Sequence, residues 1–284
     1  MHALAQPLSH AFAQRALVEL VLLGTVGGIL GCWVLFYELA YGAESLSHAL
    51  LPGLVGAALL GLPLLLGAAV GVAGAAAAIA VVGRTPLIGR DTSVAVVITS
   101  LFGLGVVLAL APSSPPGLTE LLFGDLLGVT NGDLVAGGVL AALVLLALAA
   151  LHRVLLVVGF DRTNARALGA GPLVADLSLL ALLAAAIVIG VQALGSLLVL
   201  AVLVGPAACA RLVTRRLLPM MGVAAVLGIG CGVAGLYLSY YAGTAGGASV
   251  AAVMTLVYLL LSVSQEIRHR FLRRFTGAVA TMRT

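Results

Sequence analysis

The chain has 284 residues, of which 62% are hydrophobic and only 8% are charged, and its formal net charge is +4. Charged residues make up about a quarter of an ordinary soluble domain, so this composition excludes that class. All 14 basic residues are arginines. Because they stand at the ends of apolar runs and not in one patch, their distribution also excludes a nucleic-acid-binding protein.

The apolar runs divide the chain into membrane crossings, each of which needs roughly 20 apolar residues. Residues 51–83 contain no charge and are too long for one ordinary crossing. Pro63 can divide them, because proline removes a helical hydrogen bond. The chain therefore has nine crossings, or eight if 46–83 is one long or partly re-entrant element. The expected crossings are 16–39, 63–83, 93–111, 134–151, 173–191, 194–210, 221–241 and 248–264, with a short helix near 46–61.

The arginines predict how these crossings are oriented. They concentrate in four connectors, and two crossings separate each neighbouring pair of connectors. By the positive-inside rule, all four connectors can lie on the cytoplasmic side. Nine crossings then place the N-terminus outside and eight place it inside, and Arg15 favours the inside. The four connectors are 84–90, 153–166, 211–216 and the basic tail 265–284.

The segment Glu44-Ser-Leu-Ser-His48 opens the short helix near 46–61. Glu44 and His48 are four residues apart, so they share one helical face. A carboxylate and an imidazole on one face suit a first-row divalent metal such as Zn²⁺ or Mn²⁺. Two ligands alone bind weakly, which fits a site that must release its ion. An interfacial Glu–His hydrogen bond that stabilises a helix end is the alternative that the spacing leaves open.

The most polar internal stretch is 152–171, and it contains a second candidate site. Phe160, Asp161 and Arg162 lead into a short predicted helix over 163–169, which glycine can end. Such a helix, fixed between two crossings, could dock in a groove of a soluble partner; a plain helical loop is the alternative. The chain has no G-x-x-x-x-G-K-[ST] sequence and no lysine, so it carries no nucleotide-hydrolysis motif of its own.

Taken together, these segments resemble the metal-type (ABC-3) permeases of bacterial ABC importers. Residues 44–53 are similar to the family's acidic-x-x-S-H-A-x-x-P-G segment, and residues 160–169 to its F-D-x-x-x-A-x-x-L-G coupling segment. Residues 193–211 resemble the family's segment that ends in P-A-A-x-A-R, and 123–125 resemble its L-F-G-N turn. The matches follow the family's order over about residues 15–265.

The resemblance implies an all-α, polytopic membrane helix bundle of the type II ABC importer kind, one permease domain over 1–284, in the bacterial plasma membrane. It implies that zinc or manganese is transported past Glu44 and His48, with no permanently bound cofactor. The implied partners are a second copy of the chain, a cytoplasmic ABC ATPase dimer, an extracytoplasmic metal-binding protein and the lipid bilayer. The chain itself would not be an enzyme. The implied ATPase-coupling residues, within segment 161–171 and just before it, are Phe160, Asp161, Arg162, Ala165, Arg166, Leu168 and Gly169.

The chain departs from the family pattern at two places, and other functions stay open. The family commonly has Asp where this chain has Glu44, and often a basic pair where it reads Phe36-Tyr37-Glu38. A permease for a metal chelate, such as a siderophore or cobalamin, would need a wide pathway lined by neutral or aromatic groups. An ATP-independent secondary carrier, or a membrane enzyme, would need ionisable residues within crossings. We expect Glu19 and Asp176 near segment ends.

Overall fold

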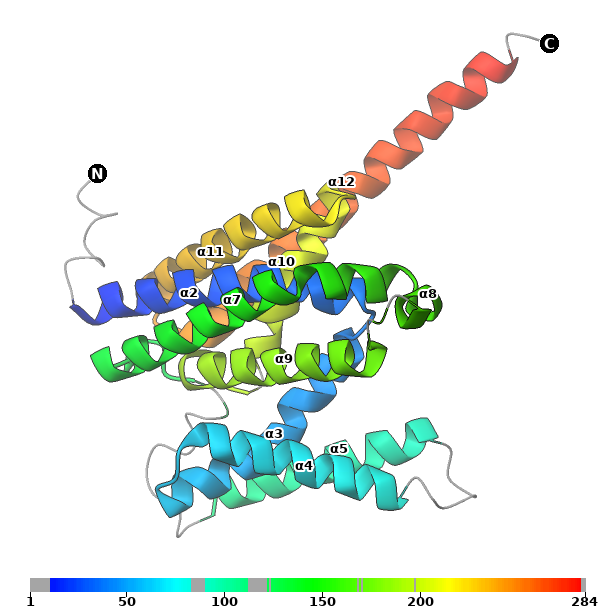
Figure 1. The fold of residues 1–284 in the computed structure, drawn as a ribbon. Helices are drawn as coiled ribbons and strands as arrows, with labels where there is room; N and C mark the ends of the chain where they lie inside the picture. Colours follow the sequence, from blue (N-terminus) through cyan, green and yellow to red (C-terminus); the bar gives the residue numbers. More distant parts are fainter. Residues whose placement is uncertain are drawn as a thin grey trace.

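The structure is a computed structural model that describes residues 11–82, 90–111, 122, 124–167, 169, 171–196 and 198–281. These residues form helices and short connectors, and no strand occurs among them, so the all-α prediction is confirmed (Figure 1). The helices are α2 (Ala11–Phe36), α3 (Ala40–Leu60), α4 (Leu64–Val82), α5 (Arg90–Ala109), α7 (Asn131–Phe160), α8 (Arg162–Ala167), α9 (Pro172–Leu194), α10 (Val199–Val213), α11 (Leu217–Ala242) and α12 (Gly246–Thr281).

Six of the described helices are long and apolar enough to cross a membrane: α2, α3, α7, α9, α11 and α12. Shorter apolar helices lie within α4, α5 and α10. The chain runs back and forth along these helices (Figure 1), and the six long and three shorter apolar helices are compatible with the predicted eight or nine crossings. The prediction of a short helix near 46–61 is wrong, because α3 begins at Ala40 and has 21 residues with Pro52 inside it.

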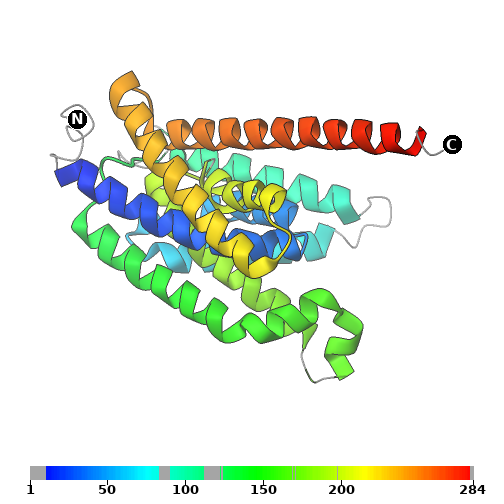
Figure 2. The same cartoon turned by 90° about the horizontal axis from the view of Figure 1, so that it is seen from above.

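Helix α2 lies at the centre of the bundle and packs against α7, α9, α10 and α11. Its side chains Leu20, Leu23, Leu30 and Trp33 are almost completely buried. Helices α3, α4 and α5 pack mainly against one another and form a second group beside the first (Figures 1 and 2). Helix α9 contacts both α3 and α4, so it joins the two groups.

The arginine-rich connectors gather at one end of the molecule. Figure 1 shows α8, the start of α5, the start of α11 and the far part of α12 at this end. The start of α2, the α3–α4 turn, the start of α7 and the α11–α12 turn lie at the opposite end. By the positive-inside rule, the end with α8 is cytoplasmic. The N-terminal end of α2, at the opposite end, would then be outside, which differs from the preference drawn from Arg15.

Stripes of exposed apolar side chains run along the outer helices. On α7, Val135, Val139, Leu143 and Leu146 are each more than half exposed and recur every three or four residues. A contiguous apolar stripe of this kind is rare on a soluble monomer. It suits a helix that faces lipid, since lipid tails are themselves apolar.

Two helices extend further than the sequence predicted. Helix α7 continues to Phe160, so His152 and Arg153 lie on a helix and not in a connector. Helix α12 continues to Thr281, so most of the basic tail 265–284 prolongs the last crossing (Figure 1). Residues 83–89, 112–121 and 123 lie outside the described residues, whereas 124–130 are described and form a non-helical connector before α7.

Candidate functional site

The structure brings both predicted metal ligands to one pocket. Glu44 and His48 project from α3 into a pocket of about 220 Å³ whose opposite wall comes from α5. Glu44 is exposed and His48 is half-buried, so both side chains are accessible from the pocket. The lining residues are Tyr41, Glu44, Ser45, His48, Ala95, Ile98 and Thr99.

The imidazole of His48 is positioned by packing. Its ring lies 4.5 Å, centroid to centroid, from the ring of Phe102 on α5, at an angle of 56°. Its Nδ1 atom is buried without a hydrogen-bond partner among the described residues. Because Pro52 has no N–H, the carbonyl oxygen of His48 also lacks its usual helical donor four residues on. His48, which lines the pocket, therefore has an imidazole nitrogen without a protein partner.

One copy of the chain supplies few donors to this pocket. No group of three His, Cys, Asp or Glu side chains close enough to hold a metal occurs within the described part of the chain. The Oγ atom of Ser47 donates to the backbone carbonyl of Glu44 at 2.8 Å. This hydrogen bond does not involve the side-chain carboxylate of Glu44. A site made from one copy alone would be weak, as the two-ligand spacing predicted.

The second candidate site is α8, a single short helix at the cytoplasmic end. The carboxylate of Asp161 opens it by accepting hydrogen bonds from the backbone N–H groups of Thr163 (2.9 Å) and Asn164 (3.0 Å). The side-chain amide of Asn164 donates to the same carboxylate at 2.6 Å. The N–H of Asn164, with smaller contributions from the other two donors, lowers the pKa of Asp161 below its usual value.

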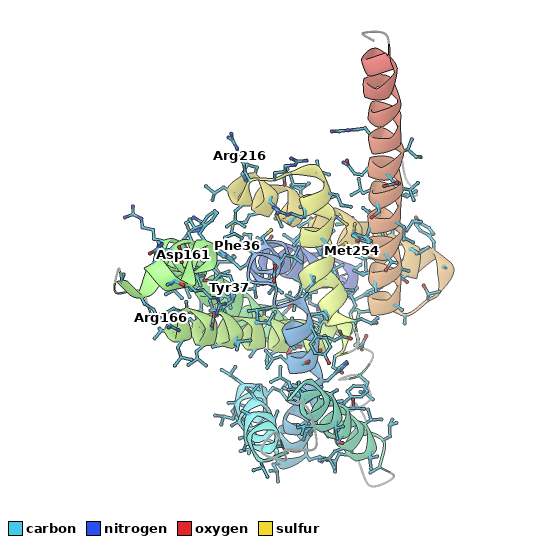
Figure 3. The ribbon with its side chains drawn as sticks, turned by 90° about the vertical axis from the view of Figure 1, so that its right-hand side faces the viewer. Phe36, Tyr37, Asp161, Arg166, Arg216 and Met254 are labelled. Carbon is cyan, nitrogen blue, oxygen red and sulfur yellow. The ribbon has the colours of Figure 1, made fainter. Side chains whose placement is uncertain are left out.

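Helix α8 is tied to the ends of three crossings. The guanidinium of Arg162 donates to both carboxylate oxygens of Asp176 on α9, at 2.9 and 3.1 Å. It also lies over the ring of Tyr37, 5.7 Å from the ring centroid. The hydroxyl of Tyr37 donates to the carbonyl of Leu155 on α7 at 2.8 Å. Figure 3 shows Tyr37 and Asp161 close together at this end, with Arg166 on the same side of the bundle.

Burial raises the pKa of Tyr37 further above the physiological range. Tyr37 directly follows α2 and is 7% exposed. Its burial, and secondly the negative charge of Asp176, raise the pKa of its hydroxyl to about 12, while Arg162 acts in the opposite direction. The hydroxyl therefore donates to Leu155 throughout the physiological pH range, and the junction of α2, α7 and α8 stays fixed.

The predicted coupling residues divide into those that anchor the segment and those that it presents. Ala165 is fully buried, and Asp161 and Arg162 make the bonds described above. Phe160 packs edge-on against Phe36, with ring centroids 5.2 Å apart. Arg166 is exposed, and Gly169 adopts a φ of +76° that favours glycine. Leu168 lies outside the described residues.

Sequence reasoning missed the anchors on neighbouring helices. Phe36 and Tyr37 were read only as a departure from the family pattern, and Asp176 only as an acid near a segment end. Asp176 is indeed one turn inside α9. In the sequence, Arg162 and Asp176 flank a short polar segment, which could have suggested an ion pair. Spacing alone, however, does not show which side chains meet.

Glu19 does not lie at a segment end as expected. It is the ninth residue of α2, is 4% exposed, and its carboxylate faces Gly137 on α7. Its Oε2 atom has no hydrogen-bond partner in the described structure. It is an ionisable group within a crossing, far along α2 from the junction with α8.

Comparison with known proteins shows which family this chain resembles in sequence and in structure. The model of the ABC 3 transport family matches residues 9–265. The manganese transport system membrane protein MntC of Listeria innocua is 32% identical over 89% of this chain and 90% of its own length. A probable iron transport system membrane protein of Haemophilus influenzae is 29% identical over 94% of this chain and 98% of its own. The solved structure of PsaBC from Streptococcus pneumoniae in complex with Fab has a TM-score of 0.86 and 29% identity, covering 92% of this chain and 95% of that one.

Proposed function

The chain belongs to the ABC 3 transport family, and from this premise we propose that it is the permease subunit of an importer for divalent metal ions, manganese or zinc. The names of several relatives support manganese, and two others name iron. The observation that carries the proposal is that Glu44 and His48 open to the same pocket between α3 and α5. The metal ion is the cargo of this site and not a resident cofactor.

The chemistry of the pocket suits passage of an ion better than its storage. A carboxylate oxygen and an imidazole nitrogen bind Mn²⁺ and Zn²⁺, and neither ligand is a thiolate that would favour soft ions. A second copy of the chain, related by a twofold axis, would bring a second Glu44–His48 pair and raise the number of donors to four. Two weak half-sites that meet and separate would bind and release the ion in turn.

Helix α8 is the proposed handle for a cytoplasmic ABC ATPase. It is exposed at Arg166 and anchored through Arg162 to α9, and Tyr37 links the same place to α2 and α7. A force on α8 would therefore reach three crossings together. The ATPase would hydrolyse ATP, and an extracytoplasmic metal-binding protein would deliver the ion to the other end of the bundle.

Pulsed electron paramagnetic resonance of Mn²⁺ added to the full chain in nanodiscs tests the ligands directly. We expect modulation from a bound imidazole nitrogen in the wild type and in His152→Gln, and no such modulation in His48→Gln. We expect Glu44→Gln to weaken Mn²⁺ binding by about tenfold or more, because even outer-sphere metal partners are worth that much. Glu38→Gln is the matched control, since Glu38 is an exposed acid outside the pocket. Nitrogen modulation that survives in His48→Gln would remove His48 from the pathway.

A further inference from the structure

A second pocket lies outside the proposed metal pathway, between α7 and α11. Both helices pack along α2, and a groove of about 420 Å³ separates them near the cytoplasmic end. Ile29 and Trp33 of α2 form its floor. One wall comes from α7 and the other from the first two turns of α11. The lining residues are Ile29, Trp33, Leu145, Leu148, Ala149, His152, Leu218 and Met221.

The lining of this groove excludes water as its main occupant. Seven of its eight lining residues are apolar, and His152 is the eighth. The ring of His152 stands edge-on to the ring of Trp33, with centroids 5.4 Å apart. Buried water needs several polar partners, and an apolar hollow does not offer them. At this depth in a bilayer, the groove suits a hydrocarbon chain.

The mouth of the groove is positively charged. Arg215 and Arg216 directly precede α11. Leu218, the second residue of α11, lines the groove, and Pro219 follows it. Arg153 does not line the groove but directly follows His152, which forms part of the opposite wall. All three arginines are exposed, and none of the lining residues is acidic. Figure 3, which views the cytoplasmic end, shows Arg216 at the top of the bundle, apart from Asp161 and Arg166.

The start of α11 adds to this charge. Arg216 is the residue that precedes its first turn, and no side chain caps the helix there. The free N–H groups of the first turn carry a partial positive charge at the mouth of the groove. Arginine is also the side chain best suited to bind a phosphate, because its planar guanidinium can donate two parallel hydrogen bonds.

From the groove and the three arginines, we propose that the cleft between α7 and α11 binds one anionic phospholipid of the cytoplasmic leaflet. An acyl chain lies against Trp33 and Ala149, and the phosphate lies between Arg153 and the pair Arg215–Arg216. The site is separate from Glu44 and His48, so it stands whether or not the metal pathway is as proposed.

The sole tryptophan of the chain makes this site directly measurable. Trp33 lies on the floor of the groove, and no other tryptophan occurs in the 284 residues. Bromine atoms on a lipid acyl chain quench tryptophan fluorescence only at short range. The full chain is reconstituted in vesicles of unlabelled phosphatidylcholine with increasing fractions of acyl-brominated phosphatidylglycerol or phosphatidylcholine. The mole fraction of each brominated lipid that halves the fluorescence of Trp33 is then compared.

We expect brominated phosphatidylglycerol to quench Trp33 at a severalfold lower mole fraction than brominated phosphatidylcholine. Arg215→Gln with Arg216→Gln should remove most of that preference, because each arginine near the membrane surface contributes at most roughly fivefold. Arg268→Gln is the matched control, because Arg268 is exposed on α12 and does not border the groove. Ala149→Phe should fill the groove and reduce quenching by both lipids. Ala150→Phe, one residue along the same helix and outside the lining, should leave quenching unchanged.

Two results would overturn the proposal. Equal quenching by the two brominated lipids in the wild type would show that the arginines select no headgroup. Little quenching by either lipid would show that protein, such as a second copy of the chain, fills the groove. The arginine variants lie in an exposed connector, so they remain informative even if Ala149→Phe does not fold.

Discussion

At the scale of single residues, charge and hydrogen bonding hold α8 in place at the cytoplasmic end. Hydrogen bonds to the ionised form of Asp161 lower its pKa. A lowered folded-state pKa stabilises the fold above the ordinary value near 3.8, and the stabilisation is lost as the pH falls through the folded value. Over the physiological pH range, the hydrogen bonds by which Asp161 caps α8 are therefore fully formed. Any pH dependence of transport near neutrality must come from other groups.

The Arg162–Asp176 pair should matter more for coupling than for stability. The two side chains are 52% and 29% exposed, so the pair is worth less than about 1 kcal/mol of folding free energy. We expect Arg162→Gln and Asp176→Asn each to change the unfolding temperature only slightly. Both should reduce ATP-driven transport, because α8 then loses its tie to α9. Thermal unfolding and transport of the two single variants and the double variant measure this.

Arg166→Gln separates the anchoring role from the docking role. Arg166 is exposed on the same helix, so its replacement should leave the unfolding temperature within the small range typical of surface substitutions. A large loss of stability in Arg162→Gln, or undiminished transport in both anchor variants, would contradict the proposed role of this pair.

At the scale of helices, small residues let α2 approach its neighbours closely. A Cβ atom added at Gly28 would lie 2.6 Å from the backbone nitrogen of Ala225 on α11. A Cβ atom added at Gly24 would lie 2.6 Å from the backbone nitrogen of Ile229. In lipid, such close packing replaces the hydrophobic effect as the force that joins helices. Gly24 and Gly28, four residues apart, thus form part of the surface through which α2 contacts α11.

Alanine substitutions should therefore have opposite effects at different glycines. Gly28→Ala should destabilise the bundle by about 1–3 kcal/mol, the usual cost of overpacking. Gly230→Ala on α11 is the matched control, because a Cβ atom there meets nothing within 4 Å. That change should be neutral or slightly stabilising, since alanine favours helix over glycine. Denaturation of the purified variants in mild detergent measures both; equal stability of the two would contradict the close α2–α11 contact.

At the scale of the whole molecule, the sequence predicts the bundle well but the contacts between helices poorly. Charge scarcity and the spacing of arginine connectors predicted an all-helical membrane protein whose ends have opposite character. The i, i+4 spacing of Glu44 and His48 placed them on one face, which they occupy. The groove around Trp33 and the bond from Tyr37 to Leu155 could not be predicted, because they join residues more than a hundred positions apart.

Helix ends were the other weakness. The predicted helix near 46–61 begins too late, because α3 starts at Ala40; Pro52 lies inside the helix in both. In a membrane, proline is tolerated because neighbouring helices and local adjustments satisfy the freed backbone groups. Similarly, the polar residues His152 and Arg153 suggested a connector, yet α7 continues past them to Phe160.

ATP-driven uptake of radioactive Mn²⁺ tests the central claim most directly. The full chain is reconstituted in vesicles with the ABC ATPase that co-purifies with it, and uptake is compared among the wild type, Glu44→Gln and Glu38→Gln. The account predicts uptake that requires ATP, persists in Glu38→Gln and falls about tenfold or more in Glu44→Gln. Uptake without ATP or ATPase, or wild-type uptake in Glu44→Gln, would contradict it.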